Sequence, residues 1–125
     1  MTNFKTFLSN LIKSCDGLYG ATIIGFDGIT LSKYFSKELP FSPDVFEALV
    51  ADYSDLVKEF HNKSLALDLG KTKNITVTME NVNILFKVLN DNYFLAVISH
   101  PNAFLGKIDY YSSIEARKFQ DTFSI

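Results

Sequence analysis

Residues Ile75–Ser99 read ITVTMENVNILFKVLNDNYFLAVIS and contain three strand-like segments separated by short polar turns. The first segment, Ile75–Glu80, alternates apolar and polar residues, whereas Val82–Leu89 and Tyr93–Ser99 are apolar at nearly every position. A strand that is covered on both faces is apolar throughout, and a strand with one open face alternates. This stretch therefore predicts an antiparallel meander with one outer and two inner strands.

Two further strand-like segments precede the meander. Ala21–Phe26 is apolar at nearly every position, and Ile29–Phe35 alternates. Asp27-Gly28 stands between them, and Asp-Gly between two apolar strands is a strong hairpin signal, because it suits a tight turn whose two central residues have positive φ. The sequence predicts a hairpin of one inner and one outer strand.

The order of the five strands follows from the turn lengths and the apolar content. Strands joined by short turns are neighbours, which fixes the hairpin and the meander separately. The first, fourth and fifth strands in chain order are the apolar ones, so they belong inside and the fifth joins the first. The predicted order is 2-1-5-4-3, with an alternating strand at each edge.

Three segments have the apolar spacing of amphipathic helices. The first runs from Phe4 to Cys15, where Thr2 or Asn3 can cap its start, and the third begins at Pro101. The second begins with a serine cap and a proline at the first helical position. Its expected buried stripe is Phe46, Leu49, Val50, Tyr53, Leu56, Val57 and Phe60. Since inner strands need cover on both faces, we expect an α+β fold with helices on each side of a five-stranded antiparallel sheet.

Composition and charge limit the possible classes of protein. The chain has 125 residues and a mass of 14.1 kDa, which predicts one domain over residues 1–125. Its net charge of −2, with scattered basic residues, lacks the basic patch of a nucleic-acid-binding protein. The single cysteine, Cys15, fits a reduced, cytoplasmic compartment. No apolar run approaches the ~18 residues of a membrane span.

No pattern typical of catalysis, cofactor binding or metal binding is found in the sequence. Gly70-Lys71-Thr72 resembles the end of a phosphate-binding loop, but Leu65 stands where the leading glycine is needed. We interpret His61 as a cation at the end of the second helix and His100 as a turn residue. The sequence therefore predicts a protein that is not an enzyme, with no catalytic residue, cofactor or metal of its own.

The two edge strands of the predicted sheet differ. The second strand has Lys33 at its centre and runs toward Pro40, which is ordinary edge protection. The third strand lacks both features along Ile75, Thr76, Val77, Thr78 and Met79. Because an unguarded edge normally pairs, we expect this one to pair with the same strand of a second copy. The alternative is that Leu65–Leu69 covers the edge within one chain.

The outer face of the second helix combines small and acidic residues. The residues that form this acidic ledge are Ala48, Ala51, Asp52 and Asp55. Solvated helix faces are usually charged, so exposure to water is one interpretation. Because small side chains allow close approach, the other is a surface for a partner protein.

Four stretches of the chain carry a resemblance to a known family. They are Cys15-Asp16-Gly17-Leu18-Tyr19-Gly20-Ala21, Phe26-Asp27-Gly28-Ile29, Tyr93–Ser99 and Pro101-Asn102-Ala103-Phe104-Leu105-Gly106. With the order of the elements, they resemble the Roadblock/dynein light chain family over essentially the whole chain. The resemblance implies a roadblock (profilin-like) fold with the sheet order given above and homodimers joined through the third strand.

The resemblance also implies a regulator or scaffold of Ras-like small GTPases. Stand-alone members of this size look like partners of a gliding-motility-type GTPase, and some activate it. In family complexes the second helix often faces the GTPase, which points to the acidic ledge here. A structural adaptor without effect on hydrolysis and a small-ligand sensor remain as alternatives. The only arginine is Arg117, so we expect any activation to reposition the GTPase's own residues rather than to use an arginine finger.

Overall fold

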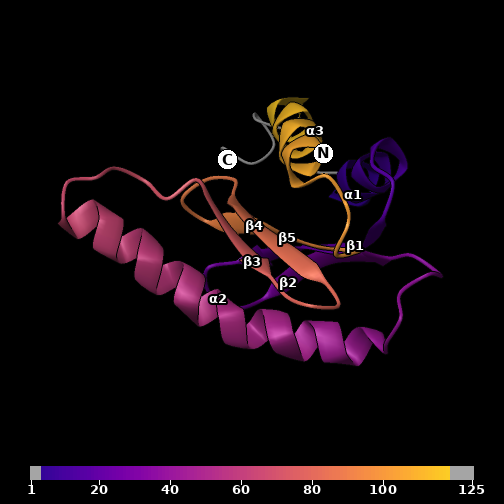
Figure 1. Ribbon diagram of the computed structural model, residues 1–125. Coiled ribbons are helices and arrows are strands. Elements are labelled where there is room, and N and C mark those ends of the chain that lie inside the picture. The colour runs from indigo at the N-terminus through magenta and orange to yellow at the C-terminus, as the bar shows by residue number, and fades with distance from the viewer. Residues whose placement is uncertain (1–3, 119–125) are drawn as a thin grey trace.

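The computed structural model describes residues 4–118, and Thr2 and Asn3, the expected caps of the first helix, lie outside them. The elements follow in the order α1 (Phe4–Ser14), β1 (Leu18–Gly25), β2 (Thr30–Phe35), α2 (Pro43–Ala66), β3 (Asn74–Thr78), β4 (Asn83–Val88), β5 (Tyr93–Ser99) and α3 (Leu105–Lys118). The strands form one antiparallel sheet in the order β2-β1-β5-β4-β3. Figure 1 shows α2 on one face of the sheet and α1 with α3 on the other. The predicted strand order and the cover on both faces are confirmed.

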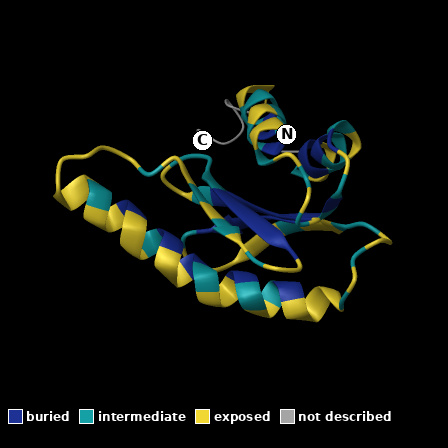
Figure 2. Cartoon of the chain, viewed as in Figure 1, coloured by how far each residue is buried: buried dark blue, intermediate teal, exposed yellow. Residues whose placement is uncertain are grey.

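Each face of the sheet has its own apolar core. Under α1 and α3, Phe7 and Leu11 pack with Ile108 and with residues of the inner strands. Under α2, Phe46 and Val57 pack in a second cluster with other residues of the same strands. The inner strands are dark blue over most of their length in Figure 2. Burial from both sides explains why their sequences are apolar at nearly every position.

The first hairpin is present, but the expected two-residue turn is wrong. Four residues, 26–29, separate β1 from β2. Gly28 has a φ of 87°, whereas Asp27 does not enter the positive-φ region. The Asp27 carboxylate instead accepts a hydrogen bond from the Ile29 N–H, at 3.0 Å. A register shift between Ile23 and Ile24 accompanies this wider turn. The Asp side chain therefore stabilises a loop that needs only one residue with positive φ.

β3 begins one residue earlier and ends two residues earlier than the sequence predicted. Met79, expected in the strand, lies in the turn to β4, where its N–H donates to the Val82 carbonyl at 2.9 Å. Closing this turn requires residues 79–82, which shortens both flanking strands. Four of the five residues expected at the edge therefore lie in β3.

α2 is longer than its predicted stripe, and the stripe itself is partly wrong. The Ser42 hydroxyl caps the helix by accepting from the Asp44 N–H, at 3.2 Å. The residues that α2 buries are Phe46, Val50, Ser54, Val57 and His61. Leu56 and Phe60, expected inside, are 46% and 55% exposed. Their side of the helix faces the β3 edge, beyond which residues 4–118 supply no further strand to cover them.

Candidate interaction surface

The main-chain groups of β3 divide between β4 and the open edge of the sheet. At its two ends, the Val88 N–H donates to the Lys73 carbonyl and the Met79 N–H donates to the Val82 carbonyl, both at 2.9 Å. In an antiparallel pair, hydrogen-bonded positions alternate with positions that direct their groups the other way. The register of β3 against β4 is regular. The positions that direct their N–H and C=O groups to the open edge are therefore Asn74, Thr76 and Thr78.

Nothing in residues 4–118 guards this edge. Thr76 and Thr78 are exposed, while Ile75 and Val77 turn toward α2 and are half-buried. The alternative that residues 65–69 cover the edge is wrong, because these residues complete the end of α2. The Leu69 N–H donates back to the Ser64 carbonyl at 2.8 Å instead of pairing with β3. The edge can therefore accept another strand, and pairing with a second copy stays a prediction.

An apolar side of α2 adjoins the open edge. We call the following residues the α2 flank: Val45, Leu49, Tyr53, Leu56 and Phe60. One end of the flank forms a groove of about 210 Å³ with Ile75 and Val77. The other end lines a groove of about 810 Å³ that reaches Met79. An exposed apolar strip beside an unguarded strand is typical of a surface that is covered in an oligomer.

The acidic ledge lies on the exposed face of α2, where Ala51 also borders a small pocket with Thr22 and Thr30 of the sheet. Its four members are exposed and recur at helical spacing: Ala48, Ala51, Asp52 and Asp55. Within residues 4–118, neither Asp52 nor Asp55 has an ion-pair partner. Glu47, on the side of α2 that faces β2, is held by Lys33 at 2.5 Å. The ledge is an accessible acidic surface, and its role in binding stays a prediction.

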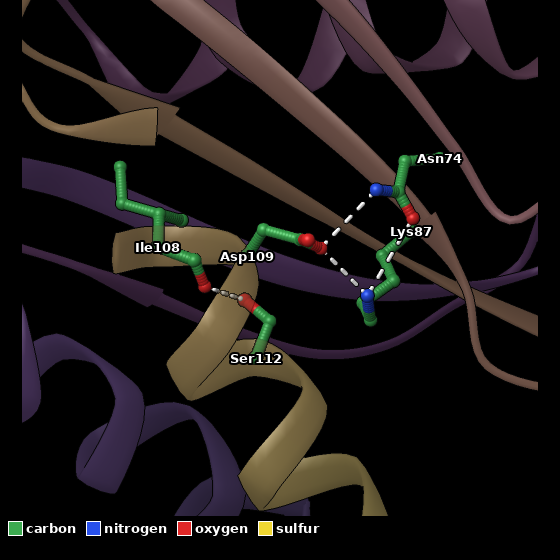
Figure 3. A network of polar contacts seen from close by, with 5 residues as sticks. All are labelled: Asn74, Lys87, Ile108, Asp109 and Ser112. Carbon is green, nitrogen blue, oxygen red and sulfur yellow. Dashed lines mark hydrogen bonds and ion pairs between the residues drawn. The ribbon is translucent and has the colours of Figure 1, made fainter. Parts of the chain in front are cut away.

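A polar network ties the start of β3 to α3 (Figure 3). The Asp109 carboxylate accepts from the Lys87 ammonium at 2.7 Å and from the Asn74 side-chain amide at 3.2 Å. The Lys87 side chain is only 14% exposed, and this carboxylate is the partner of its ammonium group. The network holds the first residue of the open edge from the face opposite α2.

We expect Asp109→Ala to lower the free energy of unfolding by about 1–2 kcal/mol, because a largely buried ammonium loses its charged partner. Lys71→Ala, which removes the ion pair with Asp91 between two well-exposed side chains, serves as the control and is expected to cost about 0.5 kcal/mol or less. Chemical denaturation at one protein concentration measures both. Equal losses in the two variants would contradict the structural role of the network.

The cysteine and the histidines have roles within the fold. Burial raises the pKa of the Cys15 thiol, which keeps it protonated near neutral pH and suits its place in the core. The His100 ring accepts from the Asn102 N–H at 3.0 Å, as expected of a turn residue. The expectation that His61 ends the second helix is wrong, because α2 continues to Ala66. His61 is buried against Phe26, with ring centroids 5.5 Å apart. No His, Cys, Asp and Glu side chains in residues 4–118 gather in threes to hold a metal ion.

The fold of this chain is similar to that of several solved structures. The chain has the Roadblock/LC7 fold: it superposes on a Roadblock/LC7 domain from Streptomyces avermitilis with a TM-score of 0.83 and 15% identity, over 99% of this chain and 100% of that chain. It also superposes on MglB from Myxococcus xanthus (TM-score 0.80, 12% identity, 98% of each chain). MglC from Myxococcus xanthus matches with a TM-score of 0.69 and 20% identity, over 95% of this chain and 98% of that chain. The sequence matches no protein-family model and no curated protein.

Across residues 4–118, no helix combines the length and the apolar character needed to cross a membrane.

Proposed function

We propose that this protein is a member of the Roadblock family that forms a homodimer through β3. The single observation that carries the homodimer is the unguarded edge of β3 beside the exposed α2 flank. Pairing of the two edges about a two-fold axis that passes between the two β3 strands, level with their middle, extends the sheet into a second subunit. The same contact brings the α2 flank of each subunit to the interface, which removes its apolar side chains from water.

We further propose that the homodimer acts in the cytoplasm as a regulator or scaffold of a Ras-like small GTPase. The axis that relates two antiparallel edge strands is perpendicular to the sheet, so both α2 helices lie on one face of the dimer. The acidic ledges lie on the exposed faces of these helices and remain uncovered there. The fold shared with MglB and MglC, and the family resemblance of the sequence, support a partner of this class.

The test is a binding assay with small GTPases from the same cell, loaded with GDP or with a non-hydrolysable GTP analogue, followed by GTP turnover with and without this protein. Nucleotide-dependent binding and faster turnover support an activating regulator. Binding without a change in turnover supports a structural adaptor. If no GTPase binds and a metabolite stabilises the protein against heat, the partner class is wrong and the small-ligand sensor stands in its place.

Arg117 is not expected to act as an arginine finger in stimulated GTP hydrolysis. It is exposed on α3, which lies across the sheet from the acidic ledge. We expect Arg117→Ala to leave stimulated GTP turnover within about twofold of wild type, whereas loss of a true arginine finger lowers the rate by about 10³–10⁵. Single-turnover hydrolysis measures the effect, with Lys107→Ala as the control, because Lys107 is an exposed cation on α3 without an ion pair in residues 4–118. Complete loss of stimulation in the Arg117 variant alone would establish an arginine finger.

A further inference from the structure

Two leucines that directly follow α2 are exposed to solvent. Leu67 is 64% exposed and Leu69 is 74% exposed. The backbone between them is fixed by a helix-ending motif in which Asp68 has a φ of 58°, the Asp68 N–H donates to the Leu65 carbonyl at 3.1 Å, and the Leu69 N–H donates to the Ser64 carbonyl at 2.8 Å. In this motif the residue after the one with positive φ, here Leu69, usually packs against an apolar residue in the last turn of the helix. That position is Ser64 in α2, so Leu69 has no apolar partner there. The two leucines, which we call the leucine tip, are therefore displayed outward on a hydrogen-bonded turn.

The chain that returns from the leucine tip to β3 is also held in place and is basic. The Ser64 hydroxyl lies 3.0 Å from the Thr72 hydroxyl, which joins the returning chain to the last turn of α2. Lys63, Lys71 and Lys73 are exposed near the tip. Lys71 pairs with Asp91 at 3.1 Å and Asp68 lies between the two leucines, so ammonium groups outnumber carboxylates near the tip by one, three against two. A fixed apolar tip with this excess of positive charge favours an apolar pocket with an acidic rim.

Such a pocket lies at the opposite end of α2. We call the groove of about 810 Å³ the N-terminal groove; its apolar lining includes Pro40, Phe41, Val45, Leu49 and Met79. Glu80 also lines it, and Asp44 is exposed beside Val45. The groove thus matches the leucine tip in apolar character and opposes it in charge.

Within one subunit the leucine tip cannot reach the N-terminal groove. Leu67 follows Val45 by 22 residues along α2, which is roughly 33 Å at 1.5 Å per residue. α2 runs antiparallel to β3, because Phe60 shares a groove with Ile75 and Leu49 shares one with Met79. A two-fold axis beside the middle of β3, between the paired strands, reverses this direction in the partner. It therefore places the N-terminal groove of one subunit at the same end of the dimer as the leucine tip of the other.

We propose that each leucine tip occupies the N-terminal groove of the other subunit. This inference rests on the proposed homodimer and assigns it a second contact besides the β3 edge. Two-fold symmetry makes the contact twice in each dimer. Burial of Leu67 and Leu69 in the groove removes the most exposed leucines of α2 and its following turn from water, and the lysines near the tip meet Asp44 and Glu80 at the rim.

The test is a disulfide between Leu67→Cys and Val45→Cys in the same chain. A disulfide needs Cα atoms about 4.4–6.8 Å apart, so these cysteines can join only across subunits. Under mild oxidation we expect a product of twice the chain mass on a non-reducing gel. The control pairs Leu67→Cys with Glu47→Cys, because Glu47 points toward Lys33 on β2, away from the groove. The native Cys15 is buried and stays in both variants.

A second measurement uses charge in place of a disulfide. We expect Leu67→Asp with Leu69→Asp to raise the dimer dissociation constant about tenfold or more, because the groove then receives carboxylates beside its own acids. Leu65→Asp is the control: Leu65 follows Glu47 by five full helical turns, so it points to the same side of α2 as Glu47, away from the α2 flank. A dimer by light scattering that gives no disulfide and is insensitive to the double Asp variant overturns this inference alone. A wild-type chain that is monomeric overturns the homodimer as well.

Discussion

Thr76→Pro is expected to convert the protein from a dimer to a monomer. Thr76 directs its N–H to the open edge, where the strand of a second copy would accept it. Proline has no N–H, and its ring blocks the approach of another strand. Since Thr76 lies at the centre of β3, both symmetry-related contacts are lost, and we expect the dimer dissociation constant to rise about 30-fold or more.

The fold should survive this substitution, because the Thr76 N–H takes no part in the pairing of β3 with β4. Thr76→Val is the matched control, since valine keeps the N–H and favours strands. Light scattering across a concentration series should give the chain mass of 14.1 kDa for the proline variant and twice that mass for wild type and the valine variant. Val77→Asp should also give monomers by placing a charge beside the α2 flank. A proline variant that remains dimeric would move the interface away from β3.

The sheet order could be predicted from the sequence because a strand that is buried on both faces is apolar at nearly every position. β1, β4 and β5 are apolar where α2 packs and also where α1 and α3 pack, so each residue of Tyr93–Ser99 reports its own burial. The edge strands differ: the alternation of β3 matches its alternating burial, whereas β2 is exposed or half-buried at every position, with Leu31 40% and Tyr34 41% exposed. The strand order depends on which strands are joined by short turns and not on the type of turn, so the wrong two-residue turn at Asp27-Gly28 did not affect it.

The α2 flank could not be separated from the core by periodicity alone. Phe46 and Phe60 are both apolar, yet Phe46 is fully buried and Phe60 is 55% exposed. A helix that packs on a sheet and on a second copy carries apolar residues over a wide arc, and one sequence does not say which part meets which neighbour. The width of the apolar arc does indicate a second neighbour, because a helix that packs on one side alone needs fewer apolar positions than α2 has.

α2 therefore divides its surface among three neighbours. One side packs on the sheet, the α2 flank faces the open edge of β3, and the acidic ledge faces solvent. The proposed dimer contact and the proposed GTPase contact therefore use different sides of α2. A substitution on the acidic ledge should leave the dimer intact. On the side of α2 that faces β2, the acidic ledge ends at Glu47, whose carboxylate pairs with Lys33.

Asp52 and Asp55 should contribute mainly to the rate at which a partner associates. Exposed charges steer a partner of opposite charge over distances comparable to the Debye length of about 10 Å at 0.1 M salt. Small side chains act differently, because they set how closely the partner backbone or side chains can approach α2. The largest effect on binding is therefore expected at an alanine of the ledge rather than at either aspartate.

Ala48→Arg is expected to weaken binding of the partner GTPase at least about 100-fold, because a long cation would fill the space above the ledge and repel a partner surface that complements its carboxylates. Ala66→Arg is the matched control: it lies on the same side of α2 as Ala48, five full helical turns away, and is also exposed. Titration calorimetry or interferometry measures the affinity, and light scattering checks that both variants remain dimers. Unchanged affinity in the Ala48 variant would place the contact on another face, whereas loss in both would show that the GTPase covers the whole length of α2.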